Sequence, residues 1–235
     1  MDWIDHERVI IERCNGIKGE IQLQRRGREY EIIYNGVFLM STYNGVSERA
    51  AVGDALKNVG ERSDNQIRVL MGGLGMGFSL QETLKCPQVQ RVVVAEIEPV
   101  VIRWNQEHLG EENNRAVSDP RVELVNIDFA ELLKEKAEQA GRSPHHTYQV
   151  VMVDTDNGSS WLSLPSNSCL YKDEGLNLII KCLSPGGVAC FWCSKREGDF
   201  EQRLRNYFQE VHFKMVKEKT GLEGAYYLAQ MAEGL

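Results

Sequence analysis

Polar and apolar residues alternate along the first part of the chain, over residues 20–40. Asn35-Gly36 lies within this stretch and marks a tight turn between two apolar runs. A period of two is typical of strands that bury one face, so we predict two or three antiparallel strands here. A short helix is predicted to follow over residues 47–56, with Ser47 as its N-terminal cap.

The pattern changes after a polar, turn-rich stretch at residues 60–66. From there on, short runs rich in Val and Ile are apolar on both faces, which is typical of parallel strands covered by helices on both sides. The predicted strands are 67–71, 91–97, 121–127, 148–154 and 187–193, followed by a hairpin of 211–216 and 225–230. The predicted helices are roughly 77–85, 99–108, 129–139, 171–182 and 198–208.

Strand–helix–strand repetition predicts an α/β protein with a doubly wound, mostly parallel seven-stranded sheet. The alternating strands before it predict a small N-terminal β extension. We place the boundary near residue 60, so that 1–60 form the extension and 61–235 a Rossmann-like nucleoside-binding catalytic domain. A length of 235 residues fits this organisation of one domain with a small appendage.

Composition and charge exclude several classes of protein. A hydrophobic share of 42% is too high for a disordered chain, and a net charge of −7 argues against nucleic-acid and anionic-membrane partners. Neither a signal-peptide layout nor a run of about 18 apolar residues is present, so we expect a cytoplasmic protein. Cys190 and Cys193 form a CxxC pattern inside an apolar run, which favours core packing over a metal or redox site. We therefore expect no metal.

A glycine-rich turn follows the first strand of the sheet. Gly73, Gly75 and Gly77 form GxGxG ahead of a helix, and glycines there allow positive φ and a close approach of ligand to backbone. A dinucleotide site usually reads GxGxxG or GxGxxA, whereas here Phe78 follows the last glycine. The turn therefore favours a nucleoside without phosphates, such as S-adenosylmethionine.

Acidic residues stand at the ends of the next three strands. Glu96 lies roughly 20 residues after the glycines, where an acid can accept hydrogen bonds from ribose hydroxyls. Asp128 ends the third strand, and Asp154 and Asp156 follow the fourth. Because the carboxyl ends of parallel strands share one edge of the sheet, these acids predict a pocket that tolerates a cationic sulfonium.

These residues resemble the spermidine synthase-like (polyamine aminopropyltransferase) family, on the class I S-adenosylmethionine-dependent methyltransferase fold. The resemblance covers about 67–195, through segments such as VLMGGLGMGFSLQE and VVVAEIEPVVI. It implies that Glu96 holds the ribose, that Asp128 faces the adenine amino group and that Asp154 lines the reacting end. The cofactor-binding residues predicted on this basis are Gly73, Gly75, Gly77, Glu96, Ile97, Asp128, Phe129 and Asp154.

Three positions depart from the family pattern. Met76 stands in the glycine turn where aminopropyltransferases carry an acid that helps to hold the ammonium of decarboxylated S-adenosylmethionine. Asn157 stands at the second Asp of the family's DSSDP loop, which takes part in deprotonating the attacking amine; Asp156 could replace it only if the loop is shifted. Val46-Ser47-Glu48 replaces the family's Tyr-Gln-Glu or Tyr-His-Glu run, and only Glu48 matches.

The departures favour an S-adenosylmethionine-dependent transferase that donates methyl to a small-molecule acceptor. Two alternatives stay open: aminopropyl transfer from decarboxylated S-adenosylmethionine to a polyamine, and a non-catalytic nucleoside-binding protein. The predicted catalytic residues are Asp154, Asp156 and Asn157, and the predicted substrate residues are Glu48, Trp161 and Tyr171. Residues 158–170 are predicted to form a mobile lid. The resemblance also implies a homodimer.

Overall fold

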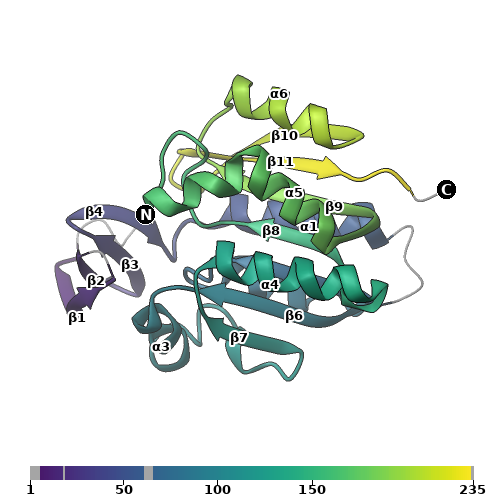
Figure 1. Cartoon of the computed structure of the whole chain (residues 1–235). Coiled ribbons are helices and arrows are strands. Elements are labelled where there is room, and N and C mark those ends of the chain that lie inside the picture. Colours follow the sequence, from purple (N-terminus) through teal and green to yellow (C-terminus); the bar gives the residue numbers. More distant parts are fainter. Residues whose placement is uncertain (1–5, 18, 61–65, 234–235) are drawn as a thin grey trace.

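The computed structural model of the protein describes residues 6–17, 19–60 and 66–233. Two sheets organise this part of the chain (Figure 1). The smaller one is antiparallel throughout and lies at the N-terminus, with the order β1-β2-β3-β4. Its strands are β1 (Arg8–Gly16), β2 (Gly19–Arg26), β3 (Glu29–Tyr34) and β4 (Val37–Ser41).

The larger sheet has seven strands in the order β10-β11-β9-β8-β5-β6-β7. The pairs from β9 through β7 are parallel, and β10 and β11 add an antiparallel hairpin at one edge. The strands are β5 (Ile67–Gly72), β6 (Val89–Glu96), β7 (Val122–Asn126), β8 (Tyr148–Val153), β9 (Leu183–Cys193), β10 (Glu210–Lys217) and β11 (Glu223–Gln230). The predicted doubly wound sheet with its N-terminal β extension is confirmed.

Helices cover both faces of the larger sheet (Figure 1). One face is packed by α4, α5 and α6, and the other by α1 and α2, while α3 lies beside β6. The α-helices are α1 (Val46–Gly60), α2 (Phe78–Leu84), α3 (Pro99–Glu107), α4 (Phe129–Arg142), α5 (Asp173–Cys182) and α6 (Gly198–Tyr207). In the described part of the chain there are also three short 3-10 helices: η1 (Ala116–Ser118), η2 (Pro144–His146) and η3 (Pro165–Tyr171).

Alternate residues of the central strands pack against the helical layers on opposite faces of the sheet. Leu70 packs in the core beneath α4 and α5, whereas its neighbours Val69 and Met71 pack beneath α1. The same alternation separates the two cysteines of the CxxC pattern, because Cys190 lies in the α1 core and Cys193 in the opposite one. Both are buried and free, so the predicted core packing is confirmed.

The structure differs from the predicted extension in two respects. The strand β1 (Arg8–Gly16) was not predicted, because four of its first five residues are charged or exposed and no apolar alternation stands out. The helix α1 is longer than the predicted 47–56, and its Ala51, Val52 and Ala55 are fully buried in the core of the larger sheet. The predicted boundary stretch falls mostly on residues 61–65, which lie outside the described part of the chain.

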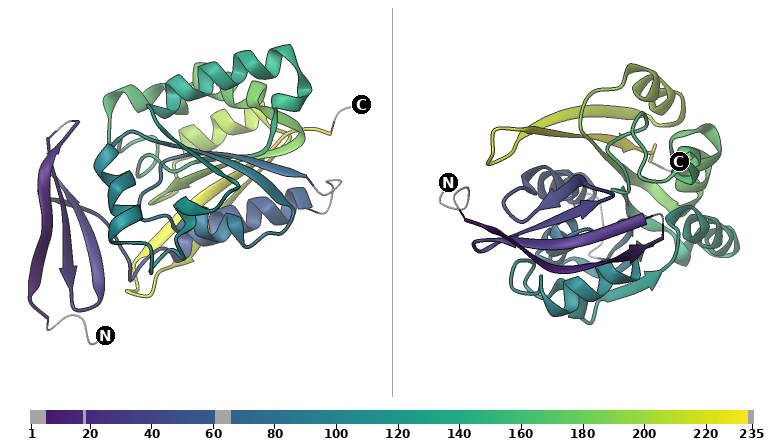
Figure 2. Two further views of the ribbon diagram at one scale, coloured as in Figure 1. Left: turned by 90° about the horizontal axis from the view of Figure 1, so that it is seen from below. Right: turned by 90° about the vertical axis from the view of Figure 1, so that its left-hand side faces the viewer.

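The N-terminal sheet stands beside one end of the larger unit (Figure 2). Its Ile21, Leu23 and Ile32 form a third buried cluster with residues of the glycine turn and of α3. Glu12 adds polar contacts, accepting hydrogen bonds from Arg103 Nη2 at 2.5 Å and from Trp104 Nε1 at 2.8 Å. These contacts hold the extension over the carboxyl ends of the parallel strands.

Candidate functional site

A cavity of about 500 Å³ lies where the N-terminal sheet faces the carboxyl ends of β5, β6 and β8. From β5 the chain adds strands first on one side of the sheet, as β6 and β7, and then on the other, as β8 and β9. The direction of strand order therefore reverses between β5 and β8, and ligands bind at such a point in doubly wound folds. The volume falls within the range of small-molecule and cofactor sites. The predicted site residues that line it are Glu48, Gly73, Gly75, Glu96, Ile97, Asp128, Phe129, Asp154, Asp156, Asn157 and Trp161. Gly77 and Tyr171 do not line it.

The glycine turn is shaped by close backbone contacts. Gly73 has φ +92°, and a Cβ there would lie 2.1 Å from the backbone oxygen of Asp154. Gly75 also has a positive φ, and its Cβ would lie 2.7 Å from Sδ of Met40 in β4. A side chain at position 73 would collide with backbone, and the left-handed φ at position 75 disfavours one, so the turn brings bare backbone to the cavity wall. Gly77 serves instead as the left-handed N-cap of α2.

Glu96 is buried at the end of β6 and is held by backbone donors. Its Oε2 accepts a hydrogen bond from Leu74 N at 3.0 Å, and its Oε1 accepts one from Glu98 N at 2.8 Å. Burial raises the pKa of Glu96, while these N–H groups lower it. A carboxylate oxygen can accept more than one hydrogen bond, so Glu96 retains capacity for ligand hydroxyls.

Asp128 lies at the start of α4 and caps it. Its Oδ1 accepts a hydrogen bond from Ala130 N at 2.7 Å, which satisfies one free donor of the first helical turn. The next residue, Phe129, packs its ring against Gly72, where a Cβ would lie 2.3 Å from Phe129 Cδ1. Asp128 and Phe129 therefore form the wall of the cavity at the β7 side, beyond Glu96 and Ile97.

Two carboxyl groups from distant parts of the chain interact at the other end of the cavity. Asp154 follows β8, and Glu48 projects from the first turn of α1. Desolvation, with the charge of Glu48 next, raises the pKa of Asp154 to about 8, and Ser79 Oγ opposes this by donating to Oδ2 at 3.3 Å. Burial also raises the pKa of Glu48. A proton or a cation bound between the two carboxyl groups stabilises such a pair.

Asp156 forms hydrogen bonds with the segment that follows it. Its Oδ1 accepts hydrogen bonds from Ser163 N at 2.6 Å and Asn167 Nδ2 at 3.0 Å. Its Oδ2 accepts them from Thr155 Oγ1 at 2.8 Å and Tyr171 Oη at 3.2 Å. A carboxylate with four such donors is committed to anchoring the loop between β8 and α5.

This loop also has a second anchor. Glu197 accepts hydrogen bonds from Ser159 N and from Ser160 N, at 2.7 and 2.9 Å. Trp161 lies between the two anchors, is 43% exposed and lines the cavity, as does Asn157. Tyr171 instead packs edge-on against Phe200 beneath the loop, with ring centroids 5.3 Å apart. The structure thus brings Trp161 to the cavity and keeps Tyr171 out of it.

Sequence reasoning missed Glu218, in the turn between β10 and β11. Its carboxylate accepts hydrogen bonds from three consecutive backbone N–H groups at the start of α1, those of Gly45, Val46 and Ser47, at 2.8–3.0 Å. Ser47 Oγ in turn donates to Glu48 Oε2 at 2.7 Å. Glu218 therefore holds the backbone from which Glu48 faces the cavity, and no local sequence signal joins residues 171 positions apart.

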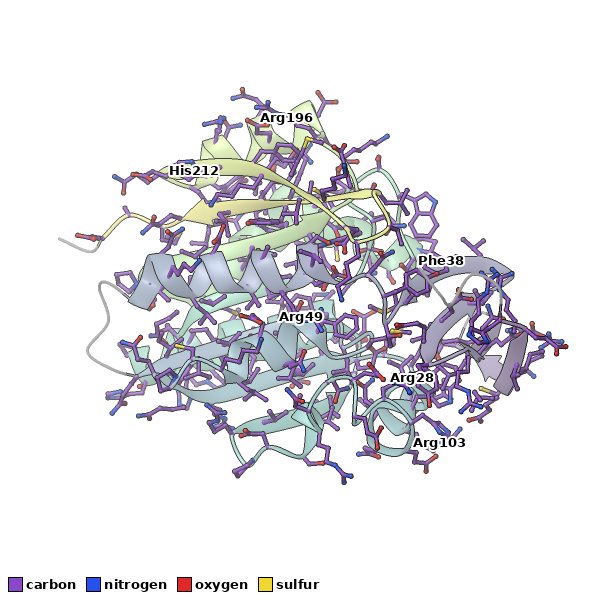
Figure 3. The ribbon with its side chains drawn as sticks, turned by 180° about the vertical axis from the view of Figure 1, so that it is seen from behind. Arg28, Phe38, Arg49, Arg103, Arg196 and His212 are labelled. Carbon is purple, nitrogen blue, oxygen red and sulfur yellow. The ribbon has the colours of Figure 1, made fainter. Side chains whose placement is uncertain are left out.

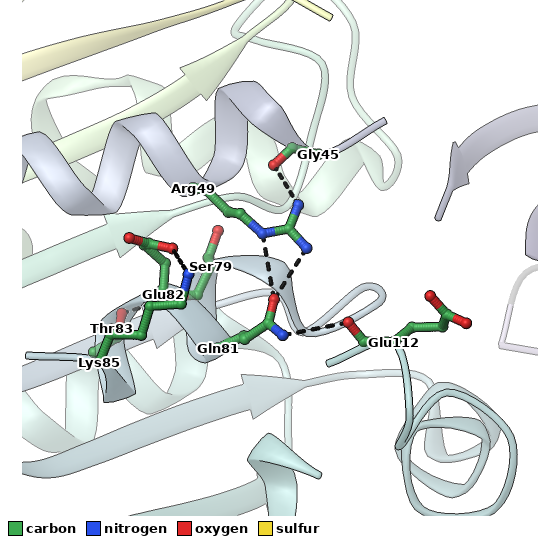
Figure 4. Close-up of polar contacts among 8 residues, drawn as sticks. All are labelled: Gly45, Arg49, Ser79, Gln81, Glu82, Thr83, Lys85 and Glu112. Carbon is green, nitrogen blue, oxygen red and sulfur yellow. Dashed lines mark hydrogen bonds and ion pairs between the residues drawn. The ribbon is translucent and has the colours of Figure 1, made fainter. Parts of the chain in front are cut away.

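Arg49, beside Glu48, ties α1 to α2 (Figure 4). Its guanidinium donates to Gly45 O at 2.9 Å and to Gln81 Oε1 at 3.0 Å. The same group lies 4.0 Å from the ring centroid of Phe78, which lines the cavity. This stacking holds the apolar side wall of the cavity next to the Glu48–Asp154 pair.

His212 lies apart from the cavity. His212 is on β10, on the side of the molecule away from the N-terminal sheet, with its Nε2 3.3 Å from Glu210 Oε2 (Figure 3). Among the residues that the structure describes, no group of three or more His, Cys, Asp or Glu side chains could hold a metal ion. Within the same ranges, no helix is long and apolar enough to cross a membrane.

The cavity fits a sulfonium nucleoside on its own geometry. Bare backbone at Gly73 and Gly75 admits a close approach, and the buried carboxylate of Glu96 has capacity for hydroxyl donors. Desolvation first, and the charge of Glu48 second, raise the pKa of Asp154, and both effects favour a positive charge placed beside it.

Sequence relatives are found among two kinds of transferase. The polyamine aminopropyltransferase of Aeropyrum pernix is 31% identical over 121 residues, which are 52% of this chain and 35% of that protein. Putrescine N-methyltransferase 1 of Nicotiana tabacum is 33% identical over 129 residues, which are 54% of this chain and 30% of that protein. The matched regions thus span well under half the length of these relatives.

Solved structures with the same fold include spermidine synthase from Thermotoga maritima. It superposes with a TM-score of 0.74 at 16% identity, over 96% of this chain and 74% of that one. Human methyltransferase-like protein 13, in complex with SAH, superposes with a TM-score of 0.61 at 18% identity, over 78% of this chain and 81% of that one. At such identities the likeness establishes the fold alone.

The sequence profile of the Spermine/spermidine synthase domain matches residues 51–225, which include the glycine turn and all the strand-end acids of the cavity. This match covers most of the chain and confirms the resemblance seen in the sequence. The chain belongs to the spermine/spermidine synthase family.

Proposed function

We propose that this protein transfers the methyl group of S-adenosylmethionine to a small-molecule amine bound beside Glu48 and Asp154. When bound, S-adenosylmethionine supplies a methyl carbon activated by the positive sulfonium. The chain contributes the alignment of the two reactants in a shared cavity, which supplies rate through proximity.

The main support for methyl transfer comes from the glycine turn. Met76 stands where the aminopropyltransferase pattern has an acid, and it is fully buried in the cluster that joins the N-terminal sheet to α3. With no acid in the turn, nothing there favours the ammonium of the decarboxylated cofactor over the intact one.

Each cavity residue then has a defined task. Glu96 accepts hydrogen bonds from the ribose, and Asp128 faces the adenine. A protonated amine must lose a proton before it attacks, and Asp154, whose pKa lies near 8, can take that proton in its ionised form, the share of which grows as the pH rises toward 8. We assign this step to Asp154, because the oxygens of Asp156 are occupied by loop donors. The proton passes from the ammonium nitrogen to Asp154, leaving the neutral amine lone pair.

Parallel calorimetric titration of S-adenosylmethionine and its decarboxylated form tests this proposal. We expect the intact cofactor to bind more tightly, and Glu96→Ala to abolish the binding of both. Tight binding of the decarboxylated form alone would overturn methyl transfer. The absence of heat with either compound would overturn both methyl and aminopropyl transfer.

Aminopropyl transfer to a polyamine is the second candidate. One observation favours it: the Glu48–Asp154 pair suits a cationic polyamine end, and Glu48 is the one residue of its run that matches the aminopropyltransferase pattern. Incubation with decarboxylated S-adenosylmethionine and putrescine distinguishes the two, because only this candidate releases methylthioadenosine. The predicted homodimer and cytoplasmic location stay predictions.

A further inference from the structure

Two tryptophans line the cavity on the side away from the predicted nucleoside residues. Trp192 lies in β9, and Trp161 lies in the loop between β8 and α5. The sheet order places β8 and β9 on one side of β5, and β6 and β7, at whose ends Glu96 and Asp128 stand, on the other. The tryptophans therefore belong to the part of the cavity that is proposed to hold the acceptor.

Trp192 is tied to the acid pair, Glu48 and Asp154, by a short chain of hydrogen bonds. Its Nε1 donates to Ser47 Oγ at 3.0 Å, and Ser47 Oγ donates to Glu48 Oε2 at 2.7 Å. The polar group of the indole is thereby satisfied within the protein. What the half-buried ring offers to the cavity is apolar surface.

Trp161 is attached to the same side of the site. Asn157 N donates to Trp161 O at 3.2 Å, and Asn157 O accepts a hydrogen bond at 3.2 Å from Ser194 N, two residues after Trp192. The Trp161 side chain is 43% exposed although it lines the cavity, so it has apolar surface left to bury against a ligand. Two leucines of the same loop, at positions 162 and 164, line the cavity as well.

The carboxyl groups of the cavity leave one place for a cation on this side. Of those that line it in the described ranges, Asp156 is committed to loop donors, and the ones at the ends of β6 and β7 lie on the nucleoside side. Glu48 and Asp154 remain. Because the pKa of Asp154 is raised to about 8, this pair keeps a proton near neutral pH and carries little more than one negative charge. One ammonium is enough to balance it.

We propose that the acceptor is a monoamine with an apolar body, an arylalkylamine or a longer alkylamine, whose nitrogen lies beside Glu48 and Asp154 and whose body packs against Trp161 and Trp192. This inference rests on the proposed function and names its substrate class. Burial of the body should strengthen binding about fourfold for each methylene group removed from water. A diamine of the same length would place its second ammonium against indole rings and leucines that offer no carboxylate.

Calorimetric titration of amines into the complex with S-adenosylhomocysteine tests this class without turnover. The probes are ethylamine, hexylamine, phenethylamine, putrescine and hexamethylenediamine. We expect hexylamine and phenethylamine to bind at least about tenfold more tightly than ethylamine. We expect both diamines to bind more weakly than hexylamine, although hexamethylenediamine has the same number of carbon atoms.

Substitution of Trp161 shows whether this ring binds the apolar body. Trp161→Ala should weaken the binding of hexylamine and phenethylamine about tenfold, and leave the affinities for ethylamine and S-adenosylhomocysteine unchanged. Trp161→Phe retains an apolar ring and should restore most of the loss. Phe38→Ala is the matched control, because Phe38 is an aromatic side chain with a similar exposure of 42% that does not line the cavity, and it should change none of these affinities.

Several results would overturn the inference. Tighter binding of either diamine than of hexylamine would assign the site to a polyamine. Equal affinities for ethylamine and hexylamine would show that no apolar body is bound. An equal loss of S-adenosylhomocysteine affinity in Trp161→Ala would place the ring against the nucleoside instead. Wild-type protein that does not bind S-adenosylhomocysteine would defeat the proposed function itself, and a separate titration of the nucleoside alone makes that result distinct from the other three.

Discussion

Replacing Asp154 by Asn tests the electrostatics of the cavity independently of any ligand. Burial and the charge of Glu48 raise the pKa of Asp154 from 3.8 to about 8 in the folded protein. Between these values the folded state keeps a proton that the unfolded chain releases. Unfolding therefore becomes more favourable as pH rises through this window, and Asp154 makes the protein less stable at pH 8 than at pH 4.

The magnitude follows from the size of the shift. One unit of pKa corresponds to about 1.4 kcal/mol, so Asp154 lowers the free energy of unfolding by at most ~1.4 kcal/mol for each pH unit inside the window. From pH 5 to pH 7 the loss is about 3 kcal/mol at most. Asn carries no titrating proton and has nearly the same shape. The Asp154→Asn variant should therefore lose this part of the pH dependence and be the more stable protein at pH 8.

Urea unfolding at pH 5, 6, 7 and 8 measures the effect for the wild type and the variant. Asp199→Asn, which removes an exposed carboxylate at the start of α6, is the matched control and should follow the wild-type profile. Glu48→Gln should weaken the pH dependence in part, because it removes the charge that acts on Asp154. If Asp154→Asn and the wild type lose the same stability between pH 5 and pH 7, the reasoning about this pair is refuted.

Three further substitutions test other parts of the site. Gly73→Ala places a Cβ 2.1 Å from a backbone oxygen at a residue with φ +92°. We therefore expect the free energy of unfolding, measured with urea, to fall by more than about 2 kcal/mol, and calorimetry to show no nucleoside binding. A stable variant that binds would contradict the geometry of the turn. Glu218→Gln should lower the free energy of unfolding by about 1 kcal/mol, as for a lost helix cap. The same variant should raise the KM for the acceptor more than it lowers kcat. The control Glu223→Gln, on the exposed start of β11, should change neither the stability nor the kinetics. Asp156→Asn should speed proteolysis of the loop before α5, measured by mass spectrometry of the fragments; unchanged protection would show that the loop does not depend on this anchor.

The predicted lid over residues 158–170 remains to be tested by the same proteolysis. Its Leu164 and Leu170 are buried, and carboxylates hold it at both Asp156 and Glu197, while Trp161 is exposed. If the loop closes over a ligand, the cut sites around Trp161 should become protected when S-adenosylhomocysteine is added. Protection that does not change with the nucleoside would contradict a mobile lid.

Much of the fold could be predicted because its signals are local. Apolar runs such as Val92–Val94, buried on both faces, indicate a covered parallel sheet, and the glycines at 73 and 75 indicate a turn that side chains cannot occupy. The carboxyl ends of parallel strands share one edge, so the gathering of Glu96, Asp128 and Asp154 followed from their places in the chain. β1 escaped prediction, since its exposed residues leave no alternation of the usual strength.

The tertiary structure alone decided how these acids are used. Asp156 and Asp154 are two residues apart, yet Asp156 anchors a loop through four donors while Asp154 faces Glu48. Glu218 reaches the start of α1, and Glu98 turns from its own helix to the N-terminal sheet, through contacts across 171 and 81 residues. Sequence determines which groups stand at the edge of the sheet, because strand direction and turn geometry are local properties. Hydrogen-bond partners and pKa depend on which distant segments pack there, and only the folded chain brings those segments together.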